Sequence, residues 1–136
     1  MKQRIILWIC LLLAAVGVSA QNSIDRFVDN ESTIGQSKFT SVVERDPLTK
    51  EVVRVVKVRE LSRGIDINTC LIKFEAERQT GRYTHKVEDG DHNTIVLAVD
   101  GKRQNRVYML QYTGNHPMQA IDGKVTVVIR MKGFTP

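Results

Sequence analysis

Four side chains that can bind a metal ion or transfer protons occur within residues 88–92, namely Glu88, Asp89, Asp91 and His92. A carboxylate beside an imidazole can act as an acid–base pair when a cleft holds both groups. The Asp-Gly-Asp core lacks the spacing and terminal glutamate of an EF-hand, and tight turns favour these residue types for backbone reasons alone. We therefore interpret residues 88–92 as a solvated turn, with a weak calcium site or a small hydrolytic site as the alternatives.

The other reactive residues are scattered. Cys70 falls in an apolar stripe, where a buried thiol acts as a small hydrophobic side chain with a raised pKa. The three histidines form no His-x-x-x-His pair of the kind that binds a metal ion. The sequence also contains no Gly-x-Ser-x-Gly elbow, which would carry a hydrolase nucleophile, and no Gly-rich loop between a strand and a helix, which would bind phosphate. We predict no catalytic residue, no metal ligand and no cofactor, and we favour a protein that is not an enzyme.

Two tyrosines offer aromatic surface to a sugar or a protein. Tyr108 and Tyr112 are two pleats apart, so they lie on the same side of a strand. Cross-strand packing beneath a helix is the structural alternative for these two residues and for Tyr83. The candidate binding residues are therefore Glu88, Asp89, Asp91, His92, Tyr108 and Tyr112.

The basic residues predict no nucleic-acid partner. Lys102, Arg103 and Arg106 surround one turn, but no aromatic residue lies beside them to stack on a base. We interpret this group as a solvated hairpin tip, with the binding of an anionic polymer or a lipid phosphate as the alternative. The sequence pI of about 9.4 also owes part of its value to Lys2 and Arg4, which belong to the segment described next.

Residues 1–20 have the pattern of a secretory signal peptide. Lys2 and Arg4 precede an uncharged apolar run over residues 5–18, and Val18-Ser19-Ala20 supplies compact residues at the cleavage positions. The apolar run is shorter than the roughly 20 residues needed to span a bilayer. We predict an exported protein, periplasmic or extracellular, with residues 21–136 as a single domain. No later apolar run is long enough for a transmembrane segment.

The domain begins with a helix, a hairpin and a second helix. Asn22 or Ser23 can cap the first helix, which carries an apolar stripe and closes at Gly35. Residues 38–45 alternate between apolar and polar side chains, and residues 52–61 are a β-branched stretch with Arg54, Lys57 and Arg59 interspersed, so we interpret the two segments as the strands of a hairpin. The second helix is capped by Asp66 or Asn68, has Ile67, Cys70, Leu71 and Phe74 on one face, and ends at Gly81.

After residue 81 the apolar period shortens to two. Strands are expected at residues 83–87, 94–99, 106–113 and 125–131, with a helical turn at 118–121 and a short tail at 133–136. This order predicts an α+β domain: a mostly antiparallel sheet of about six strands with two helices packed on one face. We expect residues 96–99 in a central strand and residues 52–58 in an edge strand open to a partner.

Several segments together resemble a known type of protein. They are Ser23-Ile24-Asp25-Arg26-Phe27, Phe39-Thr40-Ser41-Val42-Val43, Tyr83, Glu88-Asp89-Gly90 and Leu110-Gln111-Tyr112-Thr113-Gly114. In this order the chain resembles the small exported families of unknown function typical of Bacteroides-like gut bacteria. The resemblance implies a location in the cell envelope and no assigned activity. The chain differs from lipid-anchored members because it has no lipobox cysteine.

The sequence thus favours an exported small globular domain that acts as a non-enzymatic binding or interaction module of the cell envelope. Its partner would be a protein or an envelope glycan, held by an open sheet face or an edge strand. The alternative is a small hydrolase or a metal-binding protein that uses the turn from Glu88 to His92.

Overall fold

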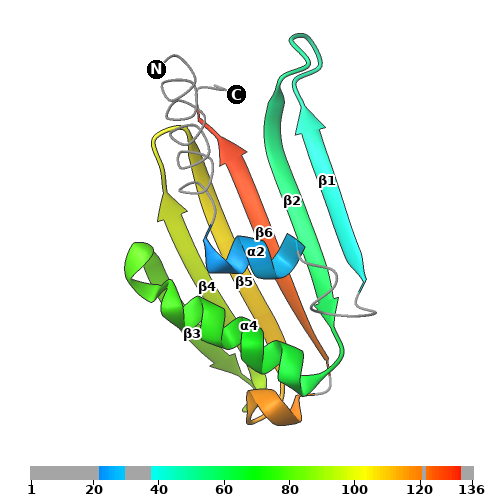
Figure 1. Ribbon diagram of the computed structural model, residues 1–136, viewed down its shortest axis with the longest axis vertical. Coiled ribbons are helices and arrows are strands. Elements are labelled where there is room, and N and C mark those ends of the chain that lie inside the picture. Colours follow the sequence, from blue (N-terminus) through cyan, green and yellow to red (C-terminus); the bar gives the residue numbers. More distant parts are fainter. Residues whose placement is uncertain (1–21, 30–37, 121, 133–136) are drawn as a thin grey trace, which may run out of the picture.

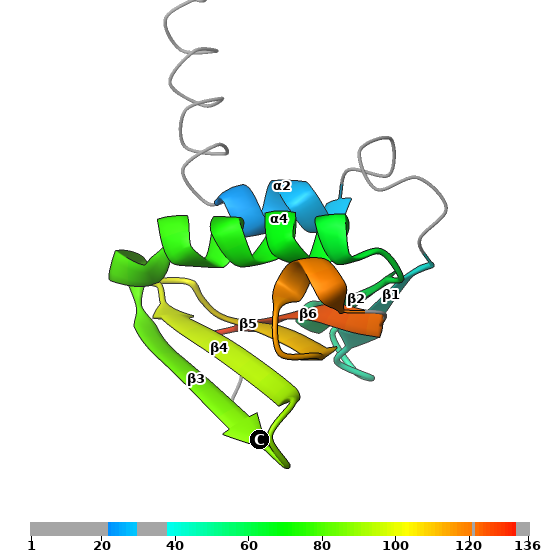
Figure 2. The ribbon, with the colours of Figure 1, turned by 90° about the horizontal axis from the view of Figure 1, so that it is seen from below.

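The computed structural model describes residues 22–29, 38–120 and 122–132. These residues form a six-stranded antiparallel sheet with two α-helices on one face, which confirms the predicted α+β fold (Figures 1 and 2). The helices are α2 (Ser23–Asp29) and α4 (Gly64–Ala76). The strands are β1 (Phe39–Arg45), β2 (Val52–Leu61), β3 (Arg82–Glu88), β4 (His92–Asp100), β5 (Gln104–Thr113) and β6 (Asp122–Met131). The predicted signal peptide, the residue Gly35, the position 121 and the tail 133–136 lie outside the described residues.

The strand order is β1-β2-β6-β5-β4-β3. The last strand, β6, pairs with β5 on one side and with β2 on the other. It therefore joins the hairpin of β1 and β2 to the meander of β3, β4 and β5. The predicted strands are all present: β1 is one residue shorter than expected, β2 has the expected bounds, and β3 to β6 extend the expected ranges by at most three residues at either end.

Two predicted strand positions are wrong. Residues 52–58 were expected at an edge, but they belong to β2, which has β1 and β6 as neighbours. The edges are β1 and β3. Residues 96–99 belong to β4, which lies next to the edge strand β3, so the central pair is β6 and β5. Both errors arise because the pairing of β6 with β2 joins segments distant in the sequence, and no local pattern encodes that pairing.

Helix α2 begins as predicted. The side-chain oxygen of Asn22 accepts hydrogen bonds from the backbone N–H groups of Ile24 (2.9 Å) and Asp25 (3.0 Å), so Asn22 is the N-cap. Ile24, Phe27 and Val28 are buried, which confirms the predicted apolar stripe. The helix therefore attaches its apolar side to the sheet directly after its cap.

Helix α4 begins earlier than predicted. It starts at Gly64 after Arg63, which makes no side-chain capping bond, and Asp66 instead pairs with Arg63 at 2.8 Å. A Cβ on Gly64 would lie 2.0 Å from the carbonyl oxygen of Met118, so this contact requires glycine. The helix ends at Ala76, and a short 3-10 helix occupies Arg78–Thr80 where the sequence predicted continued α-helix up to Gly81.

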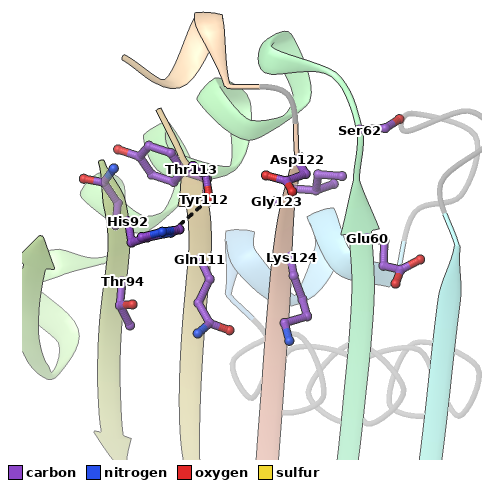
Figure 3. Close-up of a pocket in the computed structure, with 12 residues that line it drawn as sticks. Glu60, Ser62, His92, Thr94, Gln111, Tyr112, Thr113, Asp122, Gly123 and Lys124 are labelled. Carbon is purple, nitrogen blue, oxygen red and sulfur yellow. Dashed lines mark hydrogen bonds between the residues drawn. The ribbon is translucent and has the colours of Figure 1, made fainter. Parts of the chain in front are cut away.

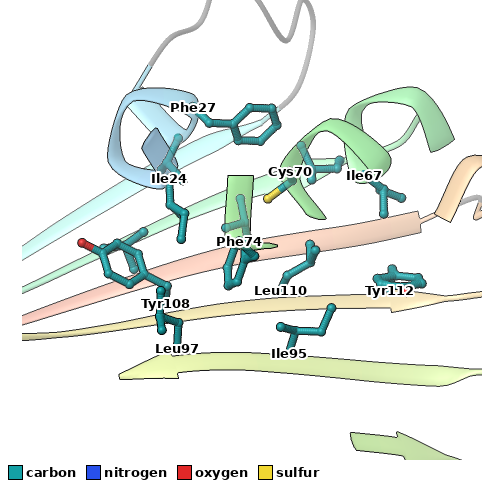
Figure 4. Close-up of a cluster of buried hydrophobic side chains, with 14 of the residues drawn as sticks. Ile24, Phe27, Ile67, Cys70, Phe74, Ile95, Leu97, Tyr108, Leu110 and Tyr112 are labelled. Carbon is teal, nitrogen blue, oxygen red and sulfur yellow. The ribbon is translucent and has the colours of Figure 1, made fainter. Parts of the chain in front are cut away.

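The hydrophobic core lies between the two helices and one face of the sheet (Figure 4). Cys70 and Phe74 of α4 are fully buried there, and burial raises the pKa of the Cys70 thiol. The predicted packing role of Cys70 is thus confirmed. The sheet contributes alternate residues of its strands, namely Leu61, Ile95, Leu97, Tyr108, Leu110, Tyr112, Val125, Val127 and Ile129.

A buried polar network fastens α2 to this face. Asp25 is 3% exposed; its Oδ2 accepts hydrogen bonds from Arg106 (2.8 Å) and from the Tyr108 hydroxyl (2.9 Å). Arg59, which is fully buried, donates from Nε to the carbonyl of Val28 at 2.6 Å. Arg106 therefore lies inside the protein and not at the solvated hairpin tip where the sequence placed it with Lys102 and Arg103.

Candidate interaction surface

The second face of the sheet carries its own row of apolar side chains. Residues on this face alternate with the buried ones, so Val107 and Met109 lie on either side of Tyr108, which points to the core. No helix or strand of the described residues covers this face (Figure 2). The apolar side chains that gather on it form what we call the apolar band, which consists of Val42, Val56, Val58, Val96, Ala98, Val107, Met109 and Val128.

The strand register places the apolar band in two adjacent rows across the sheet. In one row Val56 is opposite Val128, which is opposite Val107, which is opposite Ala98. In the next row Val58, Thr126, Met109 and Val96 follow one another across the same four strands. Val42 extends the first row onto β1, where it is 51% exposed. The band is therefore continuous across the sheet.

Polar rows border the apolar band on both sides. The first polar row runs from β1 to β4 through Glu44, Arg54, Arg130, Asn105 and Asp100. The second polar row runs from β2 to β3 through Glu60, Lys124, Gln111, Thr94 and Lys86. An apolar centre inside a polar rim is the usual composition of a protein interface.

The first polar row contains polar atoms without partners. Arg54 pairs with Glu44 through one guanidinium nitrogen, but its Nε is buried and makes no hydrogen bond among the described residues. The buried Oδ1 of Asn105 also accepts no hydrogen bond there. A hollow of about 400 Å³ lies beside it and is lined in part by Arg82, Val107 and Arg130. Both atoms are closed off from solvent, so the groups of this row that a partner can reach are its accessible ones, such as the exposed side chain of Asp100.

The second polar row lines a groove of about 520 Å³. Figure 3 shows Thr94, Gln111 and Lys124 side by side on neighbouring strands of this groove. His92 lies at its end, with Nδ1 at 3.2 Å from the hydroxyl of Thr113, and Asp122 lines the same groove. The groove thus collects hydrogen-bonding groups from four strands, since Glu60 of β2 also lines it.

The predicted turn from Glu88 to His92 is a solvent-exposed hairpin end. Asp89 (φ 55°) and Gly90 (φ 84°) adopt the left-handed conformation that such a turn requires. Glu88 pairs with Lys86 at 2.8 Å, and this hydrogen bond lowers the pKa of the Glu88 carboxyl. Asp91 lies 3.9 Å from the His92 ring. In the part of the chain that the structure describes, no group of three His, Cys, Asp or Glu side chains is placed to hold a metal ion.

The candidate tyrosines lie on the opposite, helix-covered side. Tyr108 is 1% exposed and Tyr112 is 6% exposed, and burial raises the pKa of each hydroxyl. Tyr83 donates a hydrogen bond to Glu75 of α4 at 2.8 Å. The structure therefore does not gather the six candidate residues. Only His92 and Tyr112 line the groove, and Tyr112 does so from the covered side of its strand.

Sequence reasoning anticipated an open sheet face, but it missed the apolar band on that face. Its signal was present in residues 52–58 and 96–99, which are apolar at consecutive positions and so on both faces of their strands. Both helices were predicted on one face of the sheet, which leaves the other face without a helix. Strands that are apolar on both faces therefore predict a second, apolar sheet face that a partner could cover.

Comparison with known protein families, curated proteins and solved structures gives no match for this chain. In the described residues, no helix has both the length and the apolar character needed to cross a membrane.

Proposed function

We propose that this protein is exported and acts as a non-enzymatic interaction module of the cell envelope, with the uncovered face of its sheet as the binding surface. The observation that supports this function is the apolar band, a continuous apolar surface over which no described element packs. Contiguous exposed apolar patches with polar rims mark interaction sites in proteins. The partner is a protein or an envelope glycan that presents apolar surface together with hydrogen-bonding groups.

A photo-crosslinking residue tests this function inside the envelope. It would replace Val107 in the apolar band or, as a matched control, Ile72, which is 57% exposed on the outer side of α4. We expect a crosslinked species from position 107 and none, or far less, from position 72. Equal crosslinking at both positions, or none at 107, would contradict the proposed binding surface.

The mass of the protein isolated from its native cells tests the proposed export. Cleavage after Ala20 yields a chain that begins at Gln21. A mass that includes Met1 would show that the export signal is retained, and it would exclude the exported, cleaved form.

The second candidate function is a small hydrolase or a metal-binding protein that uses the turn from Glu88 to His92. The observation in its favour is that His92 lines the groove together with Asp122 and Thr113. If His92 acts there, His92→Ala removes a measured hydrolytic activity, or excess chelator lowers the melting temperature of the unchanged protein. An activity that survives the substitution, together with an unchanged melting temperature, excludes this function.

A further inference from the structure

We infer that the uncovered face binds the same face of a second copy of this chain. The two copies are related by a two-fold axis that lies midway between the two stacked sheets, runs parallel to the strands and passes over the gap between β5 and β6. This inference rests on the proposed function, since it uses the same surface and names its occupant. Two antiparallel sheets commonly pack in this way, with their inner side chains interdigitated and the sheets about 10 Å apart.

The axis determines which residues meet. It places β6 of one copy over β5 of the other, and β2 over β4, while each cross-strand row stays over itself. Val128 then lies over Val107, and Val58 lies over Val96, because each pair shares a row. The apolar band of one copy is thereby covered by the apolar band of the other, except for Val42 of β1, which lies over Arg82 of β3.

The same axis makes the first polar row complementary to itself. Its cations, Arg54 and Arg130, lie on the β2 and β6 half of the sheet, whereas Asp100 and Asn105 lie on the β4 and β5 half. The two-fold rotation places Arg54 over Asp100 and Arg130 over Asn105. The guanidinium groups of one copy then face carboxylate and amide side chains of the other, so the row pairs opposite charge and hydrogen-bonding groups across the axis.

The second polar row also agrees with this axis. Lys124 would face Gln111, and Glu60 would face Thr94, so each charge meets a group that can hydrogen-bond with it. At the periphery Lys86 of β3 would lie near Lys38, which precedes β1 and accepts a hydrogen bond from the backbone N–H of Glu60. Lys86 is already paired with Glu88 at 2.8 Å, and solvent screens charges at a rim.

The other two-fold axis in the plane of the sheet fits less well. An axis perpendicular to the strands would place the first polar row over the second. Arg54 would then meet Glu60, but Arg130 would meet Lys124 near the centre of the interface. A like-charge contact at a buried position opposes binding strongly. The charges therefore select the axis parallel to the strands.

The area of the uncovered face is close to what a stable dimer buries. Six strands about 4.8 Å apart, crossed by rows that span about seven residues, give a flat footprint of roughly 600 Å² on each copy before side-chain relief is counted. A typical stable interface buries about 800 Å² on each partner. The uncovered face thus approaches the standard size.

Charge reversal across the axis provides the decisive experiment. The mass of the purified protein would be measured by light scattering or sedimentation at concentrations up to about 100 µM, a range that detects dimers with dissociation constants in the micromolar range. We expect the unchanged protein to dimerise. Arg54→Glu and Asp100→Arg should each weaken the dimer about tenfold or more, because each creates a like-charge contact. The double variant should recover most of the lost affinity.

Two matched variants control for charge alone. Lys102→Glu and Glu51→Arg make the same changes of charge at exposed positions outside the uncovered face, and they should leave the dimer unchanged. Arg54→Glu also places a carboxylate opposite Glu44 and can loosen β1. Val107→Lys avoids that strand, and it should abolish the dimer while the melting temperature of the monomer stays near its original value.

The outcomes separate this inference from the proposed function. A protein that stays monomeric throughout the concentration range overturns the inference, as does a dimer that the charge reversals leave intact or that the double variant fails to restore. If the protein is monomeric but position 107 crosslinks to a different molecule, the interaction module stands and only the self-association falls. If the protein is monomeric and position 107 crosslinks to nothing, both proposals fall.

Discussion

The two faces of the sheet differ in whether their buried polar groups have hydrogen-bond partners. On the covered face, the carboxylate of Asp25 receives hydrogen bonds from both Arg106 and Tyr108 within an apolar core. On the uncovered face, the Nε of Arg54 and the Oδ1 of Asn105 have no hydrogen-bond partners among the described residues. Along the same strands, the side chains on one face are packed against helices and their polar groups are paired. The side chains on the other face have no helix over them, and two of their polar atoms are unpaired among the described residues.

This difference separates stability from binding. Residues of the covered face are needed to hold the fold together, since they contact helices of the same chain. Residues of the uncovered face contact no described helix, so their substitution should affect association much more than folding. Adjacent residues on one strand can therefore be used as matched pairs to test the distinction.

The largest expected loss of stability follows removal of the buried carboxylate. Asp25→Ala leaves the Arg106 guanidinium, whose side chain is 12% exposed, without its partner. Breaking a buried ion pair in this way costs about 3–5 kcal/mol of unfolding free energy. Asp29→Ala, in the same helix, removes only the more exposed pair with Lys57 and should cost at most about 1 kcal/mol.

Urea denaturation of the two aspartate variants checks this contrast. Equal losses would mean that the buried pair contributes no more than the exposed one. The claim that the buried Asp25–Arg106 pair stabilises the fold more than the exposed Asp29–Lys57 pair would then be wrong.

A smaller effect is expected from a single added hydroxyl. Val127 is fully buried on the covered face, and Val128 follows it on the uncovered face. Val127→Thr buries a hydroxyl among apolar groups and should cost about 1–3 kcal/mol of unfolding free energy. Val128→Thr should change that free energy by no more than about 0.5 kcal/mol.

The two threonine variants are compared by chemical denaturation at low protein concentration, so that self-association does not contribute to stability. If Val128→Thr destabilises the monomer as much as Val127→Thr does, then the second face is packed within the chain. It would then no longer qualify as a binding surface.

Local patterns predicted much of the covered face. The stripe in residues 67–74 and the cap at Asn22 are each encoded within a few residues, so both appeared as predicted. The inward position of Arg106 could not be predicted in this way, because it depends on Asp25, which is distant in the sequence. The start of α4 at Gly64 likewise depends on contact with Met118.

The candidate binding surface was less predictable than the fold. The groove that contains His92 collects residues from four strands, so its composition follows from the strand order. That order depends on the pairing of β6 with β2, which alternation within each strand does not determine. Candidate residues chosen for proximity in sequence, from Glu88 to His92, accordingly form a hairpin end and not a site.

The subtlest test of the contrast uses tyrosine ionisation, because Tyr83, Tyr108 and Tyr112 all lie on the covered face. Burial and the hydrogen bond to Glu75 raise the pKa of Tyr83 to about 12, and burial also raises those of Tyr108 and Tyr112. An unfolded tyrosine has a pKa of about 10. The folded state therefore holds the three hydroxyl protons more tightly than the unfolded state does. The stability that these protonated tyrosines contribute is complete below about pH 10, and it is lost as the pH rises towards 12.

The ultraviolet absorbance of tyrosinate should consequently rise at higher pH in the folded protein than in the same protein in urea. Tyr83→Phe should remove the step near pH 12, and it should make stability fall less steeply between about pH 10 and 12, since one linked proton is gone. No tyrosine lies on the uncovered face, so none should titrate near pH 10 while the protein is folded. A folded-state step at that pH would mean that one of the three hydroxyls reaches solvent and that the covered face is not closed where that tyrosine lies.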